Sequence, residues 1–137
     1  MVKMSVVYEG GMRCSAVHGP SKSNLETDAP ADNHGKAERF SPTDLVGAAL
    51  ATCIATTLGI LGRGKDWKLE GMRLDVVKEM SSSGPRRIAR LAVEIWMPHA
   101  LGEADRAEIE RIAHSCPVHR SLNPEIEAPV IFHWPAV

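Results

Sequence analysis

The sequence has no excess of charge and few aromatic residues. Its 137 residues carry 16 Lys and Arg against 17 Asp and Glu, a net charge of −1, and only 4% are aromatic. There is no block of like charge and no basic stripe, so we expect neither nucleic acid nor a membrane surface as a partner. The scarce aromatic side chains offer no platform on which bases could stack. The length predicts one soluble domain over residues 1–137.

Cysteine is also scarce, and its spacing excludes two common uses. Cys14, Cys53 and Cys116 are the only three, and no C-x-x-C pair occurs, so the sequence does not encode a disulfide framework. The N-terminal segment is too short and too polar for a secretory signal, which predicts a cytoplasmic protein with reduced thiols. There is no phosphate loop and no dinucleotide fingerprint, so we expect no bound cofactor.

The first part of the chain predicts strands and a long loop. Residues 4–8 alternate in polarity and two glycines follow at 10–11, which predicts a hairpin with a return strand from Met12. Residues 19–37 are rich in Gly, Pro, Ser, Asn and Asp, and are expected to be loop with one short strand around Leu25. Loops of this length are often functional.

The second half predicts three more strands. Apolar and polar residues alternate over 72–77 and 90–97, with the turn SSSGP between them, and the segment VIFHW at 130–134 predicts a final strand. Each of the two longer strands has one apolar and one mixed face. This pattern is typical of an antiparallel sheet that is covered on one side.

A long apolar helix is predicted over residues 45–62. Ser41 is the expected cap, Pro42 suits the first turn, and Asp44 completes a sequence close to a capping box. The helix has no charge over 18 residues, but its many Gly, Ala and Thr make a membrane span a poor explanation. A helix that is apolar all round is buried all round, and one short chain cannot cover it. We therefore expect a homodimer.

A second helix is predicted over residues 103–116. Its apolar residues recur at helical spacing and form one stripe: Ile109, Ile112, Ala113 and Cys116. Cys116 should therefore point inward, toward the central helix, which carries Cys53 at its middle. The two cysteines are predicted to face each other in the core.

The residues alone leave three explanations of these cysteines open. Both could be inert core residues, because buried free cysteine is common. Cys116 and His119 could bind a metal, although His114 projects elsewhere and a zinc site needs more ligands. Either cysteine could be the nucleophile of a hydrolase, although no nucleophile elbow is present.

Two segments together resemble a known family. SPTDLVGAALATC and HSCPVHRSL resemble the helix-borne cysteine motifs of the OsmC/Ohr family, the osmotically induced and organic hydroperoxide resistance proteins. GGMR, DNHGK and ERFSPTDL are similar to its N-terminal hairpin and to the loop of its OsmC-like branch. The resemblance implies an α+β fold of antiparallel sheets packed on a long buried central helix, assembled as an intertwined homodimer.

The resemblance also implies a reaction. Cys53 would be the thiolate that attacks a hydroperoxide and becomes a sulfenic acid, and Cys116 would resolve that acid as a disulfide. An external dithiol, of the dihydrolipoyl type in the family, would reduce the disulfide. Because burial disfavours a thiolate, a cation is required, and Arg13 in GGMRC matches the family arginine.

One position departs from the family pattern. The Ohr branch holds its arginine with a glutamate just after the helix-opening proline, where this chain has Thr43. Asp44 is expected to cap its own helix, so Glu38 is the candidate substitute. Cys14 should project to the opposite face of the strand from Arg13 and have no role. The alternative function is a non-catalytic dimer that binds a small hydrophobic ligand, with both helix cysteines in the core.

Overall fold

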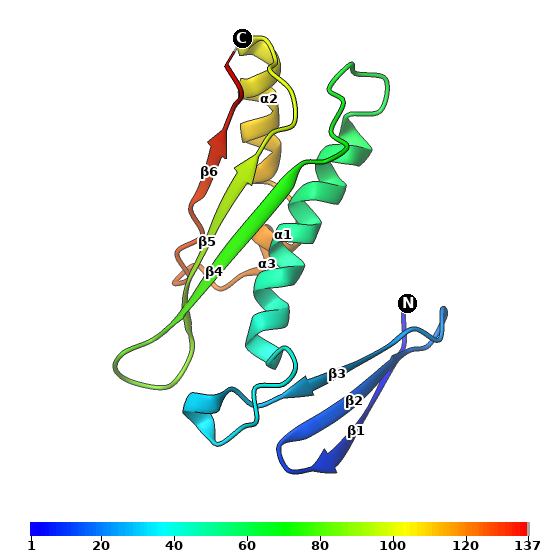
Figure 1. Ribbon diagram of the computed structural model, residues 1–137, viewed down its shortest axis with the longest axis vertical. Helices are drawn as coiled ribbons and strands as arrows, with labels where there is room; N and C mark the ends of the chain where they lie inside the picture. Colours follow the sequence, from blue (N-terminus) through cyan, green and yellow to red (C-terminus); the bar gives the residue numbers. More distant parts are fainter. Residues whose placement is uncertain (137) are drawn as a thin grey trace. The chain divides into compact units, whose positions relative to one another are not determined.

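The computed structural model describes residues 1–136 and forms two compact units, residues 1–46 and 47–137 (Figure 1). Val137, the last residue of the predicted single domain, lies outside the described residues, and the prediction of one domain stays a prediction.

The first unit is built on a three-stranded antiparallel sheet. Its strands β1 (Met4–Gly10), β2 (Arg13–His18) and β3 (Asn24–Asp28) lie in the order β1-β2-β3. The connection from β1 to β2 requires positive φ at Gly10 and Gly11, which glycine adopts without steric cost. The predicted hairpin and the short strand around Leu25 are confirmed.

The loop after β3 leads into the long helix α1 (Pro42–Leu61), with one turn of 3-10 helix η1 (Ala31–Asn33) on the way. The backbone N–H of Asp44 donates to Ser41 Oγ at 3.1 Å, and the backbone N–H of Ser41 donates to Asp44 Oδ2 at 2.8 Å. These reciprocal bonds make a capping box, as the sequence predicted. The helix begins three residues earlier than predicted, because Pro42 itself has helical geometry.

The second unit contains a mixed sheet covered by helices (Figure 1). Strands β4 (Arg73–Met80) and β5 (Ile88–Trp96) are antiparallel, whereas β6 (Val130–His133) runs parallel to β5. The prediction of purely antiparallel sheets is therefore wrong for β6. Helices α2 (Glu103–Ala113) and α3 (Pro117–Ser121) occupy the connection between β5 and β6, and parallel pairing needs a crossover of this kind.

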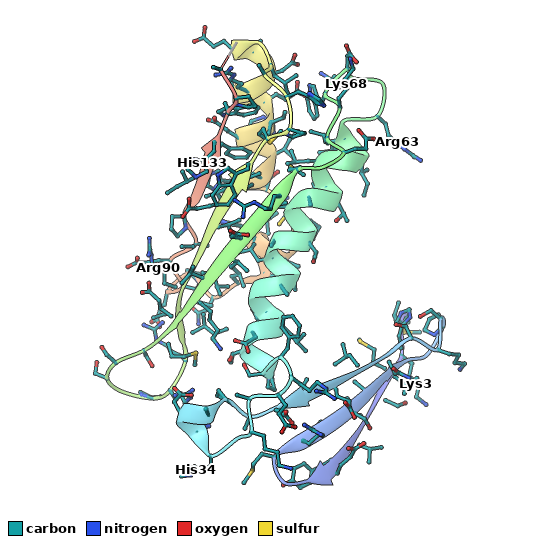
Figure 2. All side chains as sticks on the ribbon, viewed as in Figure 1. Lys3, His34, Arg63, Lys68, Arg90 and His133 are labelled. Carbon is teal, nitrogen blue, oxygen red and sulfur yellow. The ribbon has the colours of Figure 1, made fainter. Side chains whose placement is uncertain are left out.

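The core of this unit lies between α1, the sheet and α2. Its fully buried side chains come from these three elements: Leu50, Ile54, Leu58, Leu91, Val93, Ile95, Ile109 and Ile112. At Gly47 a Cβ atom would lie 3.5 Å from Leu91 and 3.6 Å from Val76, so the helix backbone runs close to the sheet. Figure 2 shows the labelled side chains of Arg90 and His133 directed away from α1. His133 stacks on Trp96 there, with ring centroids 4.6 Å apart.

Only one face of α1 is buried within the chain. Its buried residues recur at helical spacing: Gly47, Leu50, Ala51, Ile54 and Leu58. Thr52, Thr56 and Ile60 are exposed. As expected from the sequence, the single chain does not cover this helix on every side. By length and composition α1 could also cross a membrane, a test that core helices of soluble proteins pass as well.

Two isoleucines of the same sheet provide a test of this core. Ile95 is fully buried, whereas Ile131 on β6 is 53% exposed. Replacing Ile95 with Ala should lower the free energy of unfolding by about 2–5 kcal/mol, because it leaves a cavity. Ile131→Ala should cost less than about 1 kcal/mol. Urea unfolding of both variants measures the difference, and equal losses would contradict this description of the core.

Candidate functional site

The thiols of Cys53 and Cys116 meet in the second unit. Cys53 lies near the middle of α1 and is partly exposed, whereas Cys116 is fully buried. The two thiols lie close enough for Cys53 to raise the pKa of Cys116. The prediction that these cysteines face each other is confirmed. Cys53 Sγ also lies 4.0 Å from the hydroxyl of Thr57, one turn further along α1.

Cys116 is held by a short helix that the sequence analysis missed. The predicted helix 103–116 ends at Ala113, and Cys116 is instead the N-cap of α3, with Pro117 at the first helical position. Its sulfur accepts the backbone N–H of His119 at 3.4 Å. Proline at the first position of a helix is favourable, so the Cys-Pro pair was the available signal for a helix start.

The environment of Cys116 favours its protonated form. Burial is the largest cause and raises the pKa of this thiol, while the N–H of His119 lowers it in part. The neighbouring Cys53 raises the pKa of Cys116 further, through its hydrogen bond and its charge. Burial and the neighbouring Cys53 thus both favour the protonated thiol at Cys116.

A second cluster lies in the first unit, around Arg13. Arg13 on β2 is directly opposite Asp28 on β3, and the two side chains form a bidentate ion pair. Arg13 Nε donates to Asp28 Oδ1 at 2.7 Å, and Nη2 donates to Oδ2 at 2.9 Å. Nη2 also donates to Glu38 Oε2 at 2.7 Å. Among residues 1–136, no hydrogen bond is made by Nη1, which leaves its donors available.

The two carboxylates hold Arg13 in different ways. Asp28 is 1% exposed and also accepts the backbone N–H of Glu38 at 3.1 Å, so it joins β2, β3 and the loop. The side chain of Glu38 is 57% exposed and has one bond to Arg13. The ion pair with Arg13 is the main cause that lowers the pKa of Asp28. Both carboxylates raise the pKa of Arg13, which stays charged.

The remaining predicted residues are also located. Asp44 is engaged in the capping box and Thr43 contacts the hydroxyl of Ser41, so of the two acids considered as substitutes it is Glu38 that binds Arg13. Cys14 lines an apolar pocket of about 410 Å³ in the first unit, together with Ala16. Since Arg13 and Cys14 are consecutive residues of a strand, they project to opposite faces.

Asp28 was missed because its segment reads as loop. Only the register of β2 with β3 brings it opposite Arg13, and that register is not visible in the sequence. In the part of the chain that the structure describes, no group of three or more His, Cys, Asp and Glu could hold a metal ion. The rings of His114 and His119 contact each other edge to face, with centroids 5.7 Å apart.

The chain was compared with known families and proteins. The family model described as OsmC-like protein matches residues 34–129. No curated protein matches the chain. The chain is 38% identical to a protein from Psychrobacter arcticus 273-4 named for osmotic stress induction and a detoxification response. Its crystal structure gives a TM-score of 0.91, over 97% of this chain and 96% of that one.

Two more distant structures share the fold. An OsmC-like protein from Mycoplasma pneumoniae is 19% identical with a TM-score of 0.77, over 99% of this chain and 98% of that chain. The organic hydroperoxide resistance protein OhrB of Bacillus subtilis is 14% identical with a TM-score of 0.69, over 97% of this chain and 98% of that chain.

The ion pair of Arg13 and Asp28 predicts a specific dependence of stability on pH. Because the pKa of Asp28 is lowered from 3.8, the pair contributes its full stability well above pH 3.8 and loses it as the pH falls toward the lowered value. Asp28→Asn should remove this contribution at pH 7, and Glu38→Gln should cost less, because Glu38 is exposed. Urea unfolding at several pH values tests this. If the Asp28→Asn protein lost as much stability below pH 3.8 as the wild type does, the ion pair of Arg13 and Asp28 would not be the cause of that loss.

Proposed function

The chain belongs to the OsmC-like protein family, and from this membership and its paired thiols we propose that it is a thiol-dependent peroxidase that reduces organic hydroperoxides. The observation that carries the proposal is the proximity of partly exposed Cys53 to fully buried Cys116, whose pKa is raised by burial. In such a pair a substrate can reach one thiol, and the buried thiol is available to react with the oxidised product of the first.

In the first step, the thiolate of Cys53 attacks the terminal oxygen of the hydroperoxide. A sulfur–oxygen bond forms, the oxygen–oxygen bond breaks, and the alkoxide leaves and takes a proton from solvent to become an alcohol. The sulfur of Cys53 is oxidised to a sulfenic acid and the peroxide is reduced. The S–H of Cys116 supports this step by donating to the sulfur of Cys53 before the attack.

In the second step, Cys116 resolves the sulfenic acid. The charge of Cys53 and its hydrogen bond both raise the pKa of Cys116, and both are lost when Cys53 becomes a neutral sulfenic acid. Cys116 therefore becomes more readily ionised only after Cys53 has reacted. Its sulfur then attacks the sulfur of Cys53, and hydroxide leaves and takes up a proton to form water. The product is the Cys53–Cys116 disulfide, which an external dithiol reduces.

Arg13 is proposed to supply the positive charge that stabilises the Cys53 thiolate. Two facts about the first unit support this role: Asp28 and Glu38 fix the guanidinium, and its Nη1 donors are available within the described chain. In this proposal Glu38 does what the family glutamate does at the position of Thr43. The protein would work in the cytoplasm, where a dithiol pool keeps thiols reduced.

The proposal includes a homodimer. The face of α1 that carries Thr52 and Thr56 is exposed in the single chain, as are Val6, Val7 and Tyr8 of β1. Exposed apolar side chains that lie together on a protein surface mark an interaction site. A second copy of the chain is the proposed partner.

A hydrophobic-ligand binding protein is the second candidate function. The apolar pocket of the first unit favours it, since its volume of about 410 Å³ falls in the range of small-molecule sites. In that case the thiols would be core residues with no reaction of their own.

The peroxidase is tested by mass spectrometry after brief exposure to one equivalent of cumene hydroperoxide. The wild type should lose two protons, mapped to a Cys53–Cys116 bridge. Cys116→Ser should accumulate sulfenic acid at Cys53, and Cys53→Ser should stay unmodified. Cys14→Ser serves as the control and should behave as the wild type. Thiols that stay unreacted under a large excess of peroxide would favour the binding protein.

The role of Arg13 is tested by the alkylation of Cys53 with iodoacetamide at neutral pH. Arg13→Ala should slow alkylation about tenfold, because less of the thiol is ionised. Arg39→Ala is the matched control, since Arg39 pairs with Glu26 on the same unit. Equal rates in the wild type and Arg13→Ala would remove Arg13 from the proposal.

The homodimer is tested by light scattering at micromolar concentration. The wild type should have twice the mass of the 14.9 kDa chain. Thr52→Arg should weaken the dimer by burying an unpaired charge, while Thr52→Ala should not. A wild-type protein that is monomeric at this concentration would contradict the proposed assembly.

A further inference from the structure

We propose that an external thiol opens the Cys53–Cys116 disulfide by attacking the sulfur of Cys53, with Cys116 as the leaving thiolate. This inference rests on the proposed function, since it concerns the disulfide that the peroxidase cycle forms. It adds the direction of the reductive step and assigns a second role to the buried cysteine.

The sulfur atoms of Cys53 and Cys116 differ in their exposure to solvent. Thiol–disulfide exchange depends on which sulfur the incoming thiolate can reach. Cys116 is 0% exposed in the single chain, and a partner subunit could only cover more of it. Cys53 is the member of the pair with exposed surface. A reductant from solvent therefore meets Cys53.

The backbone keeps Cys116 in its buried position. Ile112 and Ala113, at the end of α2, are themselves buried, and the N–H of Ser115 donates to the carbonyl of Ile112 at 2.9 Å. The carbonyl of Cys116 accepts the N–H of Arg120 at 3.0 Å as the first hydrogen bond of α3. Bringing Cys116 to the surface would break this cap.

The α3 cap partly offsets the effect of burial, which raises the pKa of Cys116 and by itself makes it a poorer leaving group. The N–H of His119 donates to its sulfur at 3.4 Å, and the N–H of Val118 also lowers the pKa of this thiol. These donors stabilise the charge that appears on the sulfur as the disulfide breaks. Cys53 has no such cap, because it lies inside α1, and its sulfur contacts the hydroxyl of Thr57.

Burial then prevents the reverse reaction. Because burial raises the pKa of Cys116, the released thiolate takes up a proton, and a protonated thiol is a poor nucleophile. The reductant stays bonded to Cys53 long enough for its own second thiol to act. A dithiol is therefore the class of reductant that this arrangement fits.

One thiolate of the dithiol forms a bond to Cys53 as the Cys53–Cys116 bond breaks, and Cys116 leaves and is protonated. The second thiol of the reductant, as its thiolate, then attacks the reductant sulfur of the mixed disulfide. A cyclic disulfide of the reductant forms and Cys53 leaves as a thiolate. The dithiol loses two electrons and the protein disulfide gains them.

The test uses the full chain with Cys14→Ser, oxidised by diamide so that no peroxidase activity is required. The disulfide is then treated briefly with the monothiol 2-mercaptoethanol, and free thiols are blocked with N-ethylmaleimide in acid. Tryptic peptides 40–63 and 112–120 separate the two cysteines. The mercaptoethanol adduct should be at least about tenfold more abundant on Cys53, with N-ethylmaleimide on Cys116.

The outcomes separate this inference from the proposed function. A predominant adduct on Cys116, or equal amounts on both cysteines, would overturn the inference and leave the peroxidase proposal standing. If diamide did not join the two cysteines, the resolving step of the proposed function and this inference would both be wrong.

Discussion

The contact between Cys53 and Cys116 depends on the packing of α1 against the sheet and α2 of the second unit. Leu50, Ile54 and Leu58 bury one face of α1, and this places Cys53 on the flank of the helix. The α3 cap then brings the sulfur of Cys116 to the same place from the other side of the core. The different burial of the two thiols follows from these positions, and it is the basis of the roles proposed for Cys116 in resolving a sulfenic acid and as a leaving group.

Burial also determines how the guanidinium of Arg13 is held. A guanidinium held by a single exposed carboxylate would sample many positions, whereas buried Asp28 binds two of its nitrogens and leaves Nη1 available. The exposed Glu38 adds one bond from the loop. Asp28 therefore fixes the guanidinium, whereas the carboxylate of Glu38 remains exposed to solvent. In the proposed site, Asp28 and Glu38 bind the arginine in place of a glutamate at Thr43.

Local signals in the sequence predicted the helix cap, the hairpin and the facing cysteines. Features that depend on pairing between distant segments could not be predicted. The capping box of Ser41 and Asp44, the hairpin before Arg13 and the facing cysteines each follow from short motifs or helical spacing. The parallel pairing of β6 and the approach of Asp28 to Arg13 depend on register between distant segments, which a single sequence does not display. The apolar spacing over residues 103–116 does not indicate helix α3, whose local signal is Pro117 directly after Cys116, since proline suits a helix start.

The central claim is that Cys116 keeps its proton while Cys53 reacts. A titration of thiolate absorbance near ~240 nm, followed in Cys53→Ser and Cys116→Ser proteins that also carry Cys14→Ser, tests it most directly. The account predicts that the signal of Cys116, seen in the Cys53→Ser protein, appears last and only in alkaline solution. A thiolate at Cys116 near neutral pH would contradict the account, because the buried cysteine would then be the reactive one.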